Sequence, residues 1–160
     1  MPDKITVGIA DMKMVKGSGT LITYALGSCV GICLYDPMIK LAALIHIMLP
    51  LNMEAGRKTP MKYADTGIRE TLKEMEKNGA RRARIVAKIA GGAKMFETGS
   101  HTDIGNIGAR NTEAAKQKLK QLGIRLVAED TGLNYGRTVE LHCASGEFHI
   151  KSVGKPLKII

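Results

Sequence analysis

Residues 30–50 read VGICLYDPMIKLAALIHIMLP, and this stretch decides the fold. Val30 to Tyr35 is a short apolar run that predicts a strand, and Asp36-Pro37 after it is a turn signal. Lys40 to Leu49 predicts a second strand, which Pro50 closes. Nearly every position in that second run is apolar, so we expect both of its faces to be covered. The short turn between the two runs favours their pairing as neighbouring antiparallel strands.

The flanking sequence predicts two long helices and seven or eight strands in total. Apolar residues at steps of three and four trace one face of the first helix, which ends at Asn78-Gly79, and the second helix covers Ile107 to Leu122. The apolar face of the first helix consists of Met61, Ala64, Ile68, Leu72 and Met75. Further strands are expected at Ile5 to Ile9, Thr20 to Ala25, Ala83 to Ala90, Ile124 to Ala128, Val139 to Cys143 and Glu147 to Val153. A polar loop is expected at Thr98 to Gly105. Because the strands come in runs, the pattern predicts an α+β fold, and we expect one domain over residues 1–160.

Composition limits the classes of partner. The formal net charge of +9 predicts attraction to an acidic surface, although a basic surface that only keeps the protein in solution accounts for it equally well. Aromatic residues make up 4% of the chain and no nucleic-acid motif is present, so we expect no nucleic-acid binding. No signal peptide is visible, and the longest apolar run, Leu41 to Leu49, is too short to cross a bilayer. We therefore expect a cytoplasmic protein without membrane insertion, whose three cysteines are thiols.

Cys29 is the strongest candidate for chemistry. It follows Leu26-Gly27-Ser28 at the junction of two strand-like segments, where glycine permits a tight backbone path and serine leaves room for a substrate. A thiol at such a junction can be exposed while nearby backbone N–H groups point at a developing oxyanion. The alternative is a small buried apolar residue, which is the commoner fate of a free cysteine.

His46 is the natural partner for that thiol. It is the one titratable ring in the apolar run from Leu41 to Leu49, where it needs a hydrogen bond to be tolerated. It is either a satisfied core histidine or a general base that faces a cleft beside Cys29. Three other histidines, His101, His142 and His149, are weaker candidates. A zinc site from Cys29, Cys33, His142 and Cys143 lacks a C-x-x-C pair, so we expect neither a metal nor a cofactor.

Two glycine clusters invite a phosphate-binding interpretation. They are Gly91-Gly92-Ala93-Lys94 and the segment from Gly105 to Arg110, which stands at a helix start. Neither matches a Walker loop or a dinucleotide fingerprint, so tight turns are the favoured interpretation. Arg110 and Asn111 are then available to line a substrate cleft together with the backbone at Gly27 and Ser28.

Several blocks of sequence occur in a fixed order over almost the whole chain: Leu26-Gly27-Ser28-Cys29, His46 with Met48-Leu49-Pro50, Lys62-Tyr63-Ala64-Asp65, Ala87-Lys88-Ile89-Ala90-Gly91-Gly92-Ala93 with Met95-Phe96, Ile107-Gly108-Ala109-Arg110-Asn111, and Ala128-Glu129-Asp130-Thr131-Gly132. Together these blocks resemble the CheD family of chemoreceptor glutamine deamidases.

The resemblance implies a catalytic triad of Cys29, His46 and Thr23. It also implies packed mixed β-sheets, β-sandwich-like, with helices outside, as in bacterial toxin-type cysteine deamidases. The implied activity is deamidation of glutamine side chains on methyl-accepting chemotaxis receptors through a thioester on cysteine. An adaptor that binds and stimulates a CheC-type phosphatase is the alternative function, and such a phosphatase is an implied partner.

Overall fold

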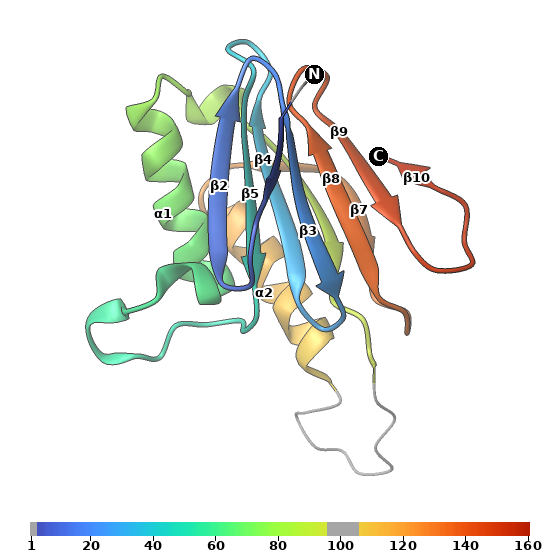
Figure 1. Ribbon diagram of the computed structural model, residues 1–160. Helices are drawn as coiled ribbons and strands as arrows, with labels where there is room; N and C mark the ends of the chain where they lie inside the picture. The colour runs from blue at the N-terminus through green and yellow to red at the C-terminus, as the bar shows by residue number, and fades with distance from the viewer. Residues whose placement is uncertain (1–2, 96–105) are drawn as a thin grey trace.

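The computed structural model describes residues 3–95 and 106–160, and within them the chain forms two five-stranded sheets and two long helices (Figure 1). The central sheet has the order β2 (Asp11–Lys16), β5 (Leu41–Ile47), β4 (Val30–Asp36), β6 (Val86–Gly91) and β7 (Arg125–Thr131). The outer sheet has the order β1 (Lys4–Thr6), β3 (Thr20–Leu26), β8 (Arg137–His142), β9 (Glu147–Lys151) and β10 (Lys158–Ile159). The polar loop expected at Thr98 to Gly105, which contains His101, lies outside the described residues.

The two predicted helices pack on one face of the central sheet. They are α1 (Ala64–Lys77) and α2 (Ile107–Gln121), and short 3-10 turns occur at Ala55–Arg57, Pro60–Lys62 and Arg82–Arg84. Figure 1 shows both helices on the side of the central sheet that faces away from the outer sheet. The chain therefore has three layers, and the prediction of an α+β fold with helices outside packed sheets is confirmed. No helix in the described ranges combines the length and apolar character that crossing a membrane requires.

Strands β4 and β5 are the centre of this architecture. All seven residues of each strand are buried, and the strands pair antiparallel with Gly31 opposite His46. Alternate residues serve two cores: Ile45 packs in the cluster shared with the helices, whereas Leu44 packs in the cluster between the sheets. The predicted antiparallel pair with both faces covered is confirmed.

Several predicted boundaries are wrong at the sheet edges. The described residues contain ten strands rather than seven or eight, because β2 and β10 were not anticipated. In β2 lysines and an aspartate interleave with methionines, which suits an edge strand but gives no continuous apolar signal. The first strand ends at Thr6 rather than Ile9, and β6 begins at Val86 because Arg82–Arg84 form a 3-10 turn.

One end of the sheets gathers the segments that matter for the site. In Figure 1 the connections that leave β1, β3, β5, β6 and β7 all lie at the lower end. We call this the lower end; it comprises residues 7–10, 26–29, 48–63, 91–95 and 131–136. Cys29 directly precedes β4 there and His46 lies near the end of β5 there, so the central strand pair delivers both candidates to one place.

The two-sided burial of β5 makes a stability prediction. Truncating Leu44 to alanine leaves a cavity between the sheets, and we expect Leu44→Ala to lower the free energy of unfolding by about 2–5 kcal/mol. Met53 is 87% exposed, so Met53→Ala is a matched control that should change stability by less than about 0.5 kcal/mol. Urea denaturation followed by circular dichroism measures both. Equal effects of the two substitutions would contradict the layer assignment.

Candidate active site

A β-bulge in β3 shapes the approach to Cys29. The register with β8 shifts between Thr23 and Leu26, and Ala25 in the bulge has a left-handed φ of 57°. The extra residue lets Thr23 and Leu26 both point into the protein, where each is fully buried, while Tyr24 between them is 54% exposed. The bulge thus aims Thr23 at the space between the sheets and leads the chain into the Gly27–Cys29 turn.

The Gly27–Cys29 turn is fixed through its carbonyl groups. The oxygen of Gly27 accepts a hydrogen bond from the Ala93 N–H at 2.8 Å, and the oxygen of Cys29 accepts one from the Gly92 N–H at 2.8 Å. The oxygen of Ser28 accepts a hydrogen bond from Asn111 Nδ2 at 2.9 Å. In a trans peptide the C=O and the following N–H point in opposite directions. The N–H groups of Ser28 and Cys29 therefore point away from the body of the protein, where an oxyanion can meet them.

Cys29 is the accessible thiol of this chain. It is partly exposed, whereas Cys33 and Cys143 are buried. Burial raises the pKa of the Cys29 thiol, and the residue's own backbone N–H opposes this by favouring the thiolate. The thiol is therefore protonated at neutral pH and needs a base to become a nucleophile.

His46 is tied across the two sheets by Thr23. The Thr23 hydroxyl donates to the Val7 carbonyl oxygen at 2.7 Å, and the same Oγ1 lies 2.7 Å from His46 Nδ1. A hydroxyl has one proton, so toward His46 it can only accept. Nδ1 therefore carries the ring proton, and Nε2 keeps a free lone pair.

The bare Nε2 of His46 is on the same face of the central sheet as Cys29. Cys29 packs against the core between the sheets, and His46 is in step along β5 with Leu44, which belongs to that core. Since His46 lies opposite Gly31, Cys29 occupies the diagonal position, with Cβ atoms about 7 Å apart or less. Gly31 places no side chain between them. Nε2 is buried and has no hydrogen-bond partner among the described residues, the Cys29 thiol included.

Burial keeps the His46 ring neutral. The side chain is 1% exposed, and desolvation lowers the pKa of His46 to about 4. With a protonated thiol on the same face, the resting pair is uncharged, so a nucleophilic role for the sulfur would require transfer of its proton to Nε2. In unliganded enzymes such catalytic hydrogen bonds are commonly long and tighten when substrate binds.

The residues predicted for the cleft have different positions. Gly27 and Ser28 are partly exposed at the turn, and Arg110 is exposed near the start of α2. Asn111 is fully buried and does not line an open surface. Its Nδ2 donates at 2.9 Å both to the Ser28 oxygen and to the Met48 oxygen, so it joins the Cys29 turn to the end of β5. Asn111 thereby fixes the spacing of the two strands that carry Cys29 and His46.

The glycine clusters serve packing at this site. Gly91 has φ 111°, and a Cβ on it would lie 2.3 Å from the Cys29 carbonyl oxygen. A Cβ on Gly108 would lie 2.4 Å from the Ala93 oxygen. Only glycine permits such close approaches of the backbone. They agree with the interpretation of these glycines as tight turns. Gly105 lies outside the described residues. The sequence analysis did not anticipate that Gly91 supports the Gly27–Cys29 turn, although the Gly91-Gly92 pair at the end of a predicted strand marked the place.

The candidate zinc ligands are not gathered in space. The thiol of Cys143 donates to the Lys40 oxygen at 3.2 Å, at the β4–β5 turn opposite the lower end. His142 stacks on His149 with ring centroids 4.0 Å apart. Within residues 3–95 and 106–160 no group of three or more His, Cys, Asp and Glu is arranged to hold a metal ion.

This site has the residue types of a cysteine hydrolase. It combines a partly exposed thiol, an imidazole on the same face with one unprotonated nitrogen, and a hydroxyl that sets the tautomer of that imidazole. The chain belongs to the CheD family: the family model described as "CheD chemotactic sensory transduction" matches residues 48–152. The expected family resemblance is thus confirmed.

Full-length relatives extend the match across Thr23, Cys29 and His46. "Probable chemoreceptor glutamine deamidase CheD" of Caldanaerobacter subterraneus subsp. tengcongensis is 50% identical over 98% of this chain and 97% of its own length. "Chemoreceptor glutamine deamidase CheD" of Thermotoga maritima is 46% identical over 94% of this chain and 93% of its own length. A crystal structure of the Bacillus licheniformis hypothetical protein YfiH aligns with a TM-score of 0.42 and 18% identity over 72% of this chain and 47% of that one, a likeness too distant to bear on the site.

The neutral His46 ring makes stability depend on pH. Below pH 6.5 the ring of the unfolded chain binds a proton, while the folded ring stays neutral down to a pKa of about 4. The unfolded state then binds more protons, so the contribution of His46 is fully present above pH 6.5 and is lost as the pH falls toward 4, by at most about 3 kcal/mol. We expect urea unfolding to show a shallower loss of stability over this range in His46→Gln than in the parent protein. Parallel pH profiles would contradict the burial of a neutral ring.

Proposed function

We propose that this protein deamidates glutamine side chains of chemoreceptors, converting them to glutamate through a thioester on Cys29. The observation that carries the proposal is the Thr23–His46 hydrogen bond, which leaves Nε2 bare on the face that holds the accessible thiol. The names of the full-length relatives support the choice of a glutamine amide on a chemoreceptor as substrate.

The first half of the reaction forms the thioester. His46 Nε2 takes the proton of the Cys29 thiol as the sulfur attacks the amide carbon, and the carbonyl oxygen becomes an oxyanion. The outward N–H groups of Ser28 and Cys29 are the donors proposed to stabilise that oxyanion, an effect typically of several kcal/mol. Collapse of the tetrahedral intermediate breaks the C–N bond, and protonated Nε2 gives its proton to the departing ammonia.

The second half regenerates the enzyme. A water molecule attacks the thioester carbon while Nε2 removes one of its protons, and the C–S bond then breaks. The sulfur recovers the proton from Nε2, and glutamate is released. Taken together, one amide and one water yield one carboxylic acid and one ammonia, with no redox change.

Thr23 has a positioning role in this scheme. Its hydroxyl accepts from Nδ1–H throughout the cycle and stabilises the transient imidazolium. A neutral acceptor stabilises the imidazolium less than a carboxylate would, and burial lowers the pKa of the ring to about 4. Such a ring is a weak base that gives up its proton readily, and protonation of the leaving nitrogen depends on that property.

A second candidate function is contact with a CheC-type phosphatase. The connection after β5 lies at the lower end (Figure 1) and exposes Leu51 to 54% and Met53 to 87%. Exposed apolar side chains beside a site favour a protein partner. The formal charge of +9 favours an acidic partner, whether substrate or regulator.

Substitutions at the proposed catalytic residues test the deamidase function. Ammonia release from receptor fragments, with mass spectrometry of the converted glutamines, should disappear in Cys29→Ala. Thr23→Val keeps the side-chain shape but loses the acceptor for Nδ1–H, so we expect the rate to fall at least about tenfold. Thr23→Ser retains the hydroxyl and should recover most of the rate.

The matched control is Cys33→Ala, which removes a buried thiol from β4, the strand that Cys29 directly precedes. Its rate should equal that of the parent protein. Deamidation at the parental rate by Cys29→Ala would refute the nucleophile assignment, and loss of phosphatase stimulation in that folded variant would tie both candidate functions to one surface.

A further inference from the structure

A buried ion pair lies behind the Cys29 turn. Arg137 is 1% exposed, and its Nε donates to Asp130 Oδ2 at 3.0 Å. Arg137 starts β8 in the outer sheet directly opposite Leu26, whereas Asp130 belongs to β7 in the central sheet. Burying two charges costs free energy, and replacing such a pair with apolar groups is often neutral or stabilising. Holding the sheets together therefore does not by itself account for an arginine at this position.

The guanidinium group reaches the backbone that supports the nucleophile loop. Its Nη1 donates to the Gly132 oxygen at 3.0 Å and, over a longer 3.4 Å, to the Gly91 oxygen. The Gly132 N–H donates to the same Gly91 oxygen at 3.0 Å. Arg137 therefore fixes the peptide unit that joins Gly91 to Gly92.

That peptide unit holds Cys29 in place. The Gly92 N–H donates to the Cys29 oxygen at 2.8 Å, and the Gly91 Cα lies so close that a Cβ on it would be 2.3 Å from the same oxygen. The Ala93 N–H, one residue further, holds the Gly27 oxygen at 2.8 Å. A continuous series of contacts thus runs from Asp130 through Arg137 and Gly91–Gly92 to the carbonyl of Cys29.

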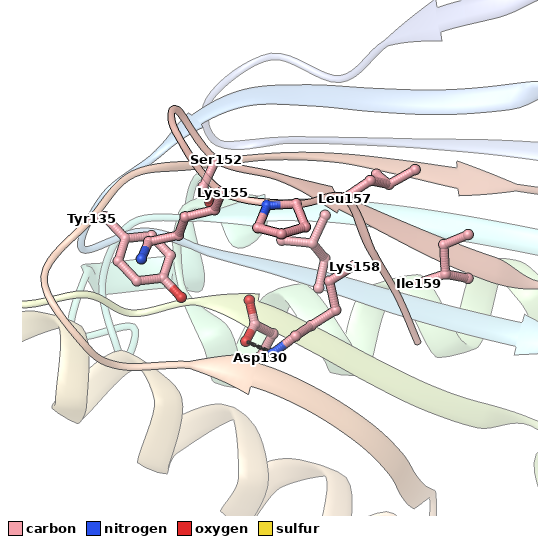
Figure 2. Close-up of a pocket in the computed structure, with 9 residues that line it drawn as sticks. Asp130, Tyr135, Ser152, Lys155, Leu157, Lys158 and Ile159 are labelled. Atoms are coloured by element: carbon pink, nitrogen blue, oxygen red, sulfur yellow. Dashed lines mark hydrogen bonds and ion pairs between the residues drawn. The ribbon is translucent and has the colours of Figure 1, made fainter.

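The pair is anchored from the solvent side as well. Figure 2 shows Asp130 beside Lys158, and Lys158 Nζ lies 3.0 Å from Asp130 Oδ1. Both residues line a pocket with a volume of about 500 Å³. The Tyr135 ring lies under two cations, with Arg137 4.6 Å and Lys155 4.4 Å from its centroid. Burial acts to raise the pKa of Asp130, but hydrogen bonds from Lys158 and Arg137 hold it below its ordinary value. The carboxylate therefore stays ionised and keeps the guanidinium oriented.

We infer that Arg137, oriented by Asp130, is a positioning residue for Cys29: it fixes the Gly91–Gly92 peptide, which holds the Cys29 carbonyl, and through the adjoining Ala93 N–H it sets the direction of the Ser28 N–H group. The inference rests on the proposed role of Cys29 as nucleophile. A positioning error of about 1 Å can cost a hundredfold in rate, so this support belongs to turnover as well as to folding.

The test compares two arginine-to-lysine substitutions in the same sheet system. Arg137→Lys can keep a positive charge beside Asp130. A lysine ammonium lacks the planar array of N–H donors with which the guanidinium reaches Asp130, Gly132 and Gly91 together. Arg84→Lys is the matched control, because Arg84 pairs with the fully buried Asp36 at 2.9 Å at the far end of β4 from Cys29. Asp130→Asn, which still accepts from Arg137 Nε, is the second variant if Arg137→Lys does not fold.

We expect Arg137→Lys to lower kcat at least about tenfold, with KM changed by less than about twofold, at a temperature where both variants are folded. Amide hydrogen exchange of Gly92 and Ala93 should speed up in Arg137→Lys and remain parental in Arg84→Lys. Equal effects of the two substitutions on kcat and on these amides would overturn the positioning role. The exchange measurement does not depend on turnover. Absence of deamidation in the parent protein would refute the proposed function, whereas the support of the Cys29 turn by Arg137 would still be tested by the exchange rates of Gly92 and Ala93.

Discussion

The hydroxyl of Thr23 has one proton, and the carbonyl oxygen of Val7, 2.7 Å away, receives it. That constraint makes Oγ1 an acceptor toward His46 Nδ1, 2.7 Å on its other side, and so leaves the lone pair of the imidazole on Nε2. The bond also crosses the space between the two sheets, from β3 to β5. Packing of the sheets and the tautomer of the ring are therefore set by the same contact, and a shift of one sheet against the other would break the hydrogen bond that fixes the imidazole.

The rest of the lower end fixes the Cys29 turn on the same face of the central sheet as that ring. Asn111 ties the Ser28 carbonyl to the Met48 carbonyl, and the Gly91–Gly92 peptide holds the Cys29 carbonyl from the other side. Left-handed non-glycine residues concentrate at this end, with φ 59° at Ala10 and 61° at Leu133, and Ala25, directly before it in β3, has φ 57°. Such conformations cost about 1–3 kcal/mol each and persist where surrounding structure enforces them, as at functional sites.

The centre of the molecule could be predicted from sequence, and its margins could not. The run from Leu41 to Leu49 predicted a strand covered on both faces because so short a continuous apolar run, closed by a proline, is typical of such strands, and both helices were visible in their periodicity. The edge strand β2 escaped because lysines interrupt its apolar residues. Thr23 entered through family resemblance alone, since a threonine in a strand looks like any other until the fold brings it to His46. Asn111 looked like a cleft residue because side-chain burial at a helix start depends on a neighbouring loop that no local pattern encodes.

The tautomer of His46 can be measured directly, without substrate or turnover. Two-dimensional ¹⁵N NMR of the histidine-labelled protein reports which ring nitrogen carries the proton. We expect a neutral ring with the proton on Nδ1 and a bare Nε2 from pH 8 down toward the pKa of about 4, and loss of that single tautomer in Thr23→Val. A proton on Nε2 in the parent protein, or a ring that titrates near its ordinary pKa, would contradict the role assigned to the Thr23 hydroxyl.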